Sequence, residues 1–225
     1  MSDNEKLSDK LTLKKKSIYD TADEAKKQMI FAFSEDYKAF LDASKTEREA
    51  TEYAEAMAKA AGYTEFRFGD KLKAGDKRYY NNRGKSLYVF RIGNYPIDRD
   101  GIRIVAAHID SPRLDLKQVP LYEDSGMAFF KTHYYGGIKK YQWTAMPLSL
   151  HGVIIKRDGS EVRVRIGDDE GDPVFYVNDL LPHLAQEQST KPLGSAIPGE
   201  VLNILVGGMT LKDGDGDGSV KLNIL

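Results

Sequence analysis

The chain has 225 residues, of which 41% are hydrophobic and 30% are charged, and its formal net charge is −1. This composition is typical of a globular protein, and the lack of net positive charge argues against a nucleic-acid or anionic-membrane partner. The sequence contains no cysteine, which excludes disulfides, thiolate nucleophiles and Cys-ligated zinc, and together with a polar N-terminus this predicts a cytoplasmic protein.

The region up to about residue 62 is predicted to be helical. Residues 35–43 carry apolar side chains at helical spacing. A second helix is predicted to begin after Thr46, because Thr46 and Glu49 have the spacing of a capping box, and Gly62 is placed to end it. Its buried face is predicted at Ala50, Tyr53, Ala54, Met57 and Ala61.

Strands are predicted after this helix. Residues 78–80 and 87–92 flank the turn sequence NNRG and predict a hairpin. Residues 102–107 are apolar except for Arg103, which predicts a strand covered on both faces. A helix followed by buried strands indicates an α/β architecture.

The pattern changes after about residue 117. Residues 148–156 and 162–166 predict a second hairpin, residues 178–188 a short helix, and residues 202–206 another strand. We therefore place a domain boundary near Lys117, which divides the chain into residues 1–117 and 118–225. Residues 220–225 are largely apolar, so a new element is expected to begin there and the second domain is expected to be truncated.

The segment 106–112, AAHIDSP, is the most informative for chemistry. His108 and Asp110 lie two residues apart at the end of the predicted strand, so their side chains are expected on the same face. Ligands bind at the carboxyl ends of strands in open α/β sheets, and imidazole suits Zn²⁺. One interpretation of this pair is a metal site, with His108 as the ligand and Asp110 as the catalytic carboxylate that orients it. Alternatively, Asp110 caps a turn before Pro112.

The remaining motifs indicate no second site. A catalytic zinc takes three protein ligands, and the sequence has no His-Glu-x-x-His motif. His133 is expected to pack among aromatic side chains, His151 to be a satisfied core or edge residue, and His183 to lie at the surface. Residues 213–218, DGDGDG, resemble half of an EF-hand loop, but Ile224 occupies the twelfth position, so an acidic surface loop is expected instead of a calcium site.

Four sequence blocks, in order, resemble the aspartyl aminopeptidases, a family of dinuclear zinc exopeptidases. The blocks are residues 107–114 (AHIDSPRL), 135–143 (YGGIKKYQW), 147–152 (PLSLHG) and 179–184 (DLLPHL). The resemblance implies that residues 1–117 are the N-terminal part of a zinc-peptidase α/β sheet domain. Residues 118–225 are then a β-rich inserted dimerisation domain.

The resemblance also implies the activity. A complete enzyme would use two zinc ions to remove N-terminal residues, acidic ones by the family's name, from peptides. His108 would bind zinc and Asp110 would orient the site, and the chains would assemble into dimers and then dodecamers. The other ligands and the general base belong to a C-terminal half that matches nothing in this sequence. We therefore expect an inactive half of an aminopeptidase whose unpaired sheet edges favour aggregation.

Two other hypotheses remain open. The chain could be a non-catalytic module that dimerises through its β-rich part, since a complete metal site is missing from the sequence. It could also be a zinc protein that is complete by itself, which would require three or four converging ligands.

Overall fold

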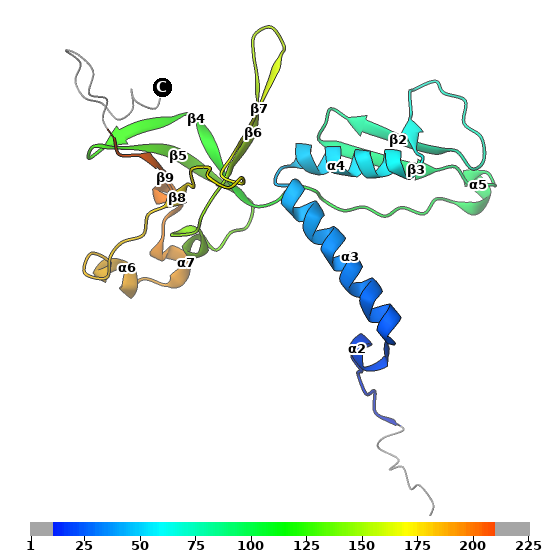
Figure 1. The fold of residues 1–225 in the computed structure, drawn as a ribbon, viewed down its shortest axis with the longest axis horizontal. Coiled ribbons are helices and arrows are strands. Elements are labelled where there is room, and N and C mark those ends of the chain that lie inside the picture. The colour runs from blue at the N-terminus through cyan, green and yellow to red at the C-terminus, as the bar shows by residue number, and fades with distance from the viewer. Residues whose placement is uncertain (1–10, 210–225) are drawn as a thin grey trace, which may run out of the picture. The chain divides into compact units, whose positions relative to one another are not determined.

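The structure is a computed structural model that describes residues 11–209 (Figure 1). The chain forms two compact units, Met1–Pro96 and Ile97–Leu225. This division follows contacts within the chain, and the predicted boundary near Lys117 stays a prediction. No helix within residues 11–209 is long and apolar enough to cross a membrane. The acidic repeat at 213–218 and the apolar segment at 220–225 lie outside the described residues.

The helices of the first unit begin at side-chain caps. Between residues 12 and 96 they are α2 (Ile18–Thr21), α3 (Glu24–Ala43) and α4 (Glu47–Ala60). Asp23 caps α3, which contains the predicted helix and starts well before it. The Thr46 hydroxyl accepts a hydrogen bond from the Glu49 N–H, and the Glu49 carboxylate accepts one from the Thr46 N–H, so the predicted capping box is confirmed. Gly62 follows α4 with φ +81°, as a helix-ending glycine requires.

The sheet of the first unit contains the predicted hairpin. Its strands, in spatial order, are β1 (Thr64–Glu65), β2 (Lys77–Asn82) and β3 (Ser86–Arg91). Helix α4 lies along this hairpin (Figure 1). Its buried residues are Ala50, Thr51 and Ala58. The predicted buried face was wrong at Met57 and Ala61, which are exposed, because α4 buries the face that carries Thr51 and Ala58 instead.

Residues 102–107 do not form the predicted strand. This segment is exposed and has no regular secondary structure, and Val105 is 100% exposed. A strand covered on both faces needs hydrogen-bonding neighbours, and no strand within residues 11–209 pairs with this segment. The apolar pattern was therefore insufficient to specify a strand without partners.

The second unit is built on an antiparallel sheet. After the short helix α5 (Ile97–Asp100), its strands in spatial order are β4 (Arg113–Asp124), β5 (Met127–Tyr135), β9 (Ile204–Gly207) and β8 (Tyr176–Val177). The turn between β4 and β5 uses positive φ at Ser125 and Gly126. The core beside this sheet comprises Val177, Ile197, Leu202 and Ile204.

The described part of the second unit, up to residue 209, also contains a separate hairpin and several short helices. The hairpin pairs β6 (Leu150–Ile155) with β7 (Glu161–Ile166), as predicted. The helices are η1 (Lys140–Trp143), α6 (Gln186–Thr190), α7 (Leu193–Ala196) and η2 (Gly199–Val201). The helix predicted over 178–188 overlaps α6 only at 186–188, because the Asp179 carboxylate accepts a hydrogen bond from the Leu180 N–H and Pro182 has no N–H to continue a helix. The mixture of helices and sheets agrees with the predicted α/β class.

Candidate functional site

The structure brings His108 and Asp110 together on the extended segment before β4. The Nδ1 atom of His108 lies 2.9 Å from the Asp110 carbonyl oxygen and 3.3 Å from its carboxylate Oδ1. Both neighbours are hydrogen-bond acceptors, so in the neutral imidazole Nδ1 carries the proton and Nε2 presents its lone pair. The His108 side chain is 84% exposed, which leaves Nε2 accessible to a ligand.

Tyr135, the last residue of β5, holds the other oxygen of Asp110. Its hydroxyl donates a 2.6 Å hydrogen bond to Asp110 Oδ2. This hydrogen bond, followed by one from the backbone N–H of Asp110 and by the nearby His108, lowers the pKa of Asp110 below its usual range. The carboxylate is therefore ionised at neutral pH, with one oxygen toward Tyr135 and the other toward His108.

The strand register explains why residues so distant in sequence meet. Arg113 pairs with Tyr135 across β4 and β5, and its guanidinium carbon lies 4.3 Å from the centre of the Tyr135 ring. Arg113 also donates to Asp115 Oδ1 at 2.7 Å and to the Ser111 carbonyl at 3.3 Å. The AHIDSPRL and YGGIKKYQW blocks of the sequence are thus adjacent in space. Sequence reasoning missed Tyr135 as a site residue, although it begins the second of these blocks.

The donor set fits one ligand position of a zinc ion. An accessible imidazole nitrogen, with the other ring nitrogen bound to a carbonyl and a carboxylate, is the arrangement that zinc-binding histidines adopt. However, no group of three or more His, Asp or Glu side chains within residues 11–209 is placed to hold a metal. The described residues therefore do not form a complete zinc centre by themselves.

The other three histidines have the surroundings that the sequence predicted. His133 stacks on Tyr134 with 5.7 Å between ring centres, and His183 is exposed. The side chain of His151 is only 7% exposed, and its Nε2 lies 2.9 Å from Asp168 Oδ2 and 3.1 Å from Ser149 Oγ. A nucleophilic triad needs the serine and the carboxylate on different ring nitrogens, so this cluster is structural.

Burial of Asp168 opposes its ionisation but does not prevent it. Burial acts to raise the pKa of Asp168, while hydrogen bonds from Ser149, His151 and Arg165 outweigh that effect and leave the pKa lowered. The ionised carboxylate thus stabilises the end of the β6–β7 hairpin.

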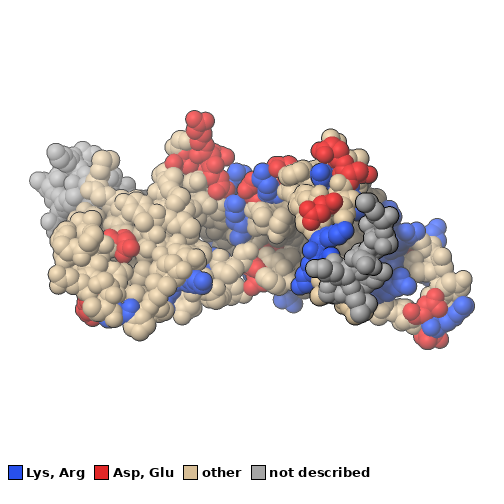
Figure 2. All heavy atoms as spheres, turned by 90° about the horizontal axis from the view of Figure 1, so that it is seen from below, with Lys and Arg blue, Asp and Glu red and all other residues tan. Residues whose placement is uncertain are grey.

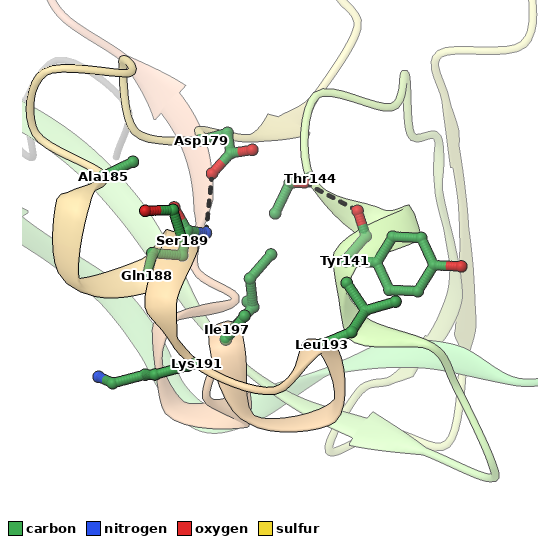
Figure 3. Close-up of a pocket in the computed structure, with 10 residues that line it drawn as sticks. Tyr141, Thr144, Asp179, Ala185, Gln188, Ser189, Lys191, Leu193 and Ile197 are labelled. Carbon is green, nitrogen blue, oxygen red and sulfur yellow. Dashed lines mark hydrogen bonds between the residues drawn. The ribbon is translucent and has the colours of Figure 1, made fainter.

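A pocket of about 380 Å³ lies elsewhere in the second unit (Figure 3). Its lining residues are Tyr141, Thr144, Asp179, Ala185, Gln188, Ser189, Lys191, Leu193, Ala196 and Ile197. Several polar groups there bind protein atoms: Gln188 Nε2 donates to Asp179 Oδ1 at 3.3 Å, and Thr144 donates to the Tyr141 carbonyl at 3.0 Å (Figure 3). The pocket therefore indicates no particular ligand chemistry.

Comparison with known proteins identifies a family that matches most of this chain. Residues 40–224 match the family model for aminopeptidase I zinc metalloproteases, M18. A probable M18 family aminopeptidase 1 of Clostridium acetobutylicum is 50% identical over 214 residues, which cover 93% of this chain and 46% of the relative. The chain thus spans about half the length of the curated relatives that it matches.

Two solved structures share the fold. The M18 aminopeptidase of Thermotoga maritima superposes with a TM-score of 0.85 at 38% identity, covering 95% of this chain and 46% of the other. Aminopeptidase I of Clostridium acetobutylicum gives a TM-score of 0.80 at 44% identity, covering 95% and 48%. The matched region includes His108, Asp110 and Tyr135.

Proposed function

Because the chain belongs to the M18 family of zinc metalloproteases, we propose that it forms part of an aminopeptidase that removes N-terminal residues from peptides. One observation of the site carries this proposal. His108 lies within the matched region with its Nδ1 hydrogen-bonded and its Nε2 accessible to a metal. The substrate would be a peptide with a free α-amino group, and the resemblance favours acidic N-terminal residues.

Each residue of this partial site has a separate task. Zinc, when bound, would supply Lewis-acid polarisation of the scissile carbonyl and a water of lowered pKa. His108 would hold one ion through Nε2, and Asp110 would keep the proton on Nδ1 and the imidazole in position. We propose two ions in the complete centre, with the other ligands and the general base outside residues 11–209. These residues alone would then be inactive.

Assembly and location complete the proposal. The β6–β7 hairpin exposes Ile154, Ile155 and Val162, which favours homo-oligomers formed through the β-rich part of the chain, dimers first and dodecamers at most. Acidic and basic side chains both occur across the face drawn in Figure 2, which offers no support for a nucleic-acid or membrane partner. The cysteine-free composition supports a cytoplasmic location.

Zinc titration by calorimetry tests the metal role. His108→Ala is expected to lower the zinc affinity of the chain at least about tenfold, whereas His183→Ala, which removes another exposed imidazole, is expected to leave it unchanged. Equal affinities in both variants would contradict the assignment of His108. In parallel, the chain is expected not to hydrolyse aspartyl or glutamyl peptide substrates, and measurable hydrolysis would contradict the proposed inactivity.

A second candidate function is a non-catalytic assembly module. The observation that favours it is the lack of a three-ligand metal group within residues 11–209. Dimers in sedimentation velocity, combined with zinc affinity that does not depend on His108, would support this function over the first. Monomers would count against it.

A further inference from the structure

Building on the proposed function, we propose that Tyr135 is a positioning residue of the metal site. Its hydroxyl holds the carboxylate of Asp110, and Asp110 in turn keeps the imidazole of His108 with Nε2 available to the metal. The contacts that carry this inference are the 2.6 Å Tyr135–Asp110 hydrogen bond and the 2.9 Å and 3.3 Å contacts between Asp110 and His108 Nδ1.

The two residues that form this hydrogen bond lie in segments with different secondary structure. Asp110 lies on an extended segment without regular secondary structure. Tyr135 ends β5, which pairs with β4 on one side and β9 on the other. A partly exposed carboxylate on such a segment would sample several rotamers by itself, so an anchor on a paired strand restricts it.

Further contacts fix the Tyr135 ring and the Asp110 segment to each other. The guanidinium of Arg113 covers the ring, and the same side chain donates to the carbonyl of Ser111, next to Asp110. Gly136 has φ +76° and lies directly beside Pro112. The strand register thus delivers the tyrosine hydroxyl to Asp110 from a defined direction.

The chemical consequence concerns the imidazole tautomer. An unrestrained neutral imidazole exchanges its proton between Nδ1 and Nε2, and only the form with Nδ1–H leaves Nε2 free for a metal. Two acceptors from Asp110 select that form here. Without the Tyr135 hydroxyl, Asp110 loses its anchor and the selection weakens. Removing such an outer partner of a metal ligand lowers metal affinity by about tenfold or more.

The neighbouring tyrosine provides a matched control. The ring of Tyr134 contacts His133 and lies 5.8 Å from Lys140 Nζ, so its environment differs from that of Tyr135. Tyr134→Phe and Tyr135→Phe each remove one hydroxyl from adjacent residues of β5, but only the second removes the hydrogen bond to Asp110.

The test uses nitrogen-15 NMR of the histidine side chains in the whole chain at about pH 9, where histidines are neutral. In the wild type and Tyr134→Phe, His108 is expected to carry its proton on Nδ1. In Tyr135→Phe, its two nitrogen shifts are expected to move toward a mixture of tautomers. Unchanged His108 shifts in Tyr135→Phe would overturn the inference.

A double-mutant cycle excludes a general structural effect. If Tyr135 acts through Asp110, adding Tyr135→Phe to Asp110→Ala should cause no further change in the His108 shifts. An additional change of the same size as in the single variant would overturn the inference. Unfolding of Tyr135→Phe would be detected by Trp143 fluorescence, because Trp143 packs against the core of the same unit. If Tyr135→Phe unfolds, the His108 nitrogen shifts in Asp110→Ala are the remaining test. Retention of the wild-type His108 tautomer in Asp110→Ala would overturn the inference.

Zinc titration of the same variants separates this inference from the proposed function. Tyr135→Phe is expected to weaken zinc binding about tenfold and Tyr134→Phe to have no effect. Absence of zinc binding in the wild type, together with a changed tautomer in Tyr135→Phe, would refute the metal role of this chain and uphold the positioning role. Zinc binding that depends on His108 but not on Tyr135, with an unchanged tautomer, would uphold the metal role of the chain and refute the positioning role of Tyr135.

Discussion

Asn81 on β2 donates a 2.6 Å hydrogen bond to Glu55 on α4, and so joins the helix to the hairpin of the first unit. Glu55 also pairs with Lys59 at 2.7 Å. The hydrogen bond from Lys59, followed by the one from Asn81, lowers the pKa of Glu55. The ionised form of the Glu55 carboxyl is therefore more stable in the folded chain than in the unfolded chain.

This relationship predicts a pH-dependent contribution to stability. A glutamate whose pKa is lowered by folding contributes fully above its unfolded value of about 4.3, and the contribution is lost as the pH falls through the folded pKa. Glu55→Gln should thus lower the free energy of unfolding by about 1 kcal/mol at pH 7 and by much less at pH 3. Urea unfolding followed by circular dichroism measures both values. The exposed Glu24→Gln is the control, and an equal loss at both pH values would contradict the prediction.

The capping box of α4 gives a second prediction. Thr46→Ala removes the side-chain acceptor for the Glu49 N–H and should destabilise the first unit by about 1 kcal/mol. Thr46→Ser keeps the hydroxyl and should cost much less. Amide hydrogen exchange at the start of α4 provides the local measurement. Equal exchange rates in the two variants would show that the cap is unimportant.

A buried hydroxyl in the second unit gives a third prediction. Thr132 on β5 is 3% exposed, and its hydroxyl donates to the carbonyl of the fully buried Leu202. Thr132→Val keeps the shape but leaves that carbonyl unsatisfied, which should cost about 1–3 kcal/mol. Urea unfolding monitored by Trp143 fluorescence reports on this unit. Thr190→Val, which removes an exposed hydroxyl, should change the unfolding free energy by less than about 0.5 kcal/mol.

Local signals in the sequence were sufficient for elements that depend on adjacent residues. The cap at Thr46, the hairpin of β2 and β3 and the hairpin of β6 and β7 were all predicted, because turn and cap chemistry operate within a few residues. The strand prediction for residues 102–107 was wrong because a strand needs hydrogen-bonding partners, which no local sequence pattern supplies. The helix predicted over 178–188 starts only at residue 186, because Asp179 and Pro182 compete with helical hydrogen bonding before it.

The site was predictable only where it is contiguous. His108 and Asp110 stand two residues apart, so their proximity followed from the sequence, while their roles stay predictions. Tyr135 joins them only through the register of β4 against β5, which contains a shift between Leu116 and Leu121. Such a bulge changes which side chains face each other, and the sequence gives no direct signal for its position.

The exposed segment at residues 102–107 predicts self-association. Val105 is fully exposed, with Ile102 and Ile104 also largely exposed beside it. Apolar extended segments without strand partners favour intermolecular pairing, so Val105→Asp should reduce association with little change in unfolding free energy. Sedimentation velocity across a concentration series measures the first effect. The control Val177→Asp places a charge in the core and should unfold the second unit, and unaltered association in Val105→Asp would contradict the prediction.

Alanine substitutions at two glycines with positive φ distinguish the energetic cost of backbone strain from that of steric overlap. Gly159 in the β6–β7 turn has φ +82°, and no atom lies within 4 Å of an added Cβ, so Gly159→Ala should cost about 1 kcal/mol from the backbone alone. Gly167 has φ +106°, and an added Cβ would lie 3.0 Å from Ser149 Cα. Gly167→Ala should therefore cost about 1–3 kcal/mol more than Gly159→Ala in urea unfolding. Displacement of Ser149 would also weaken its contact with His151, so the His151 NMR signals should change in Gly167→Ala alone. Equal costs in the two variants would mean that Ser149 moves aside freely.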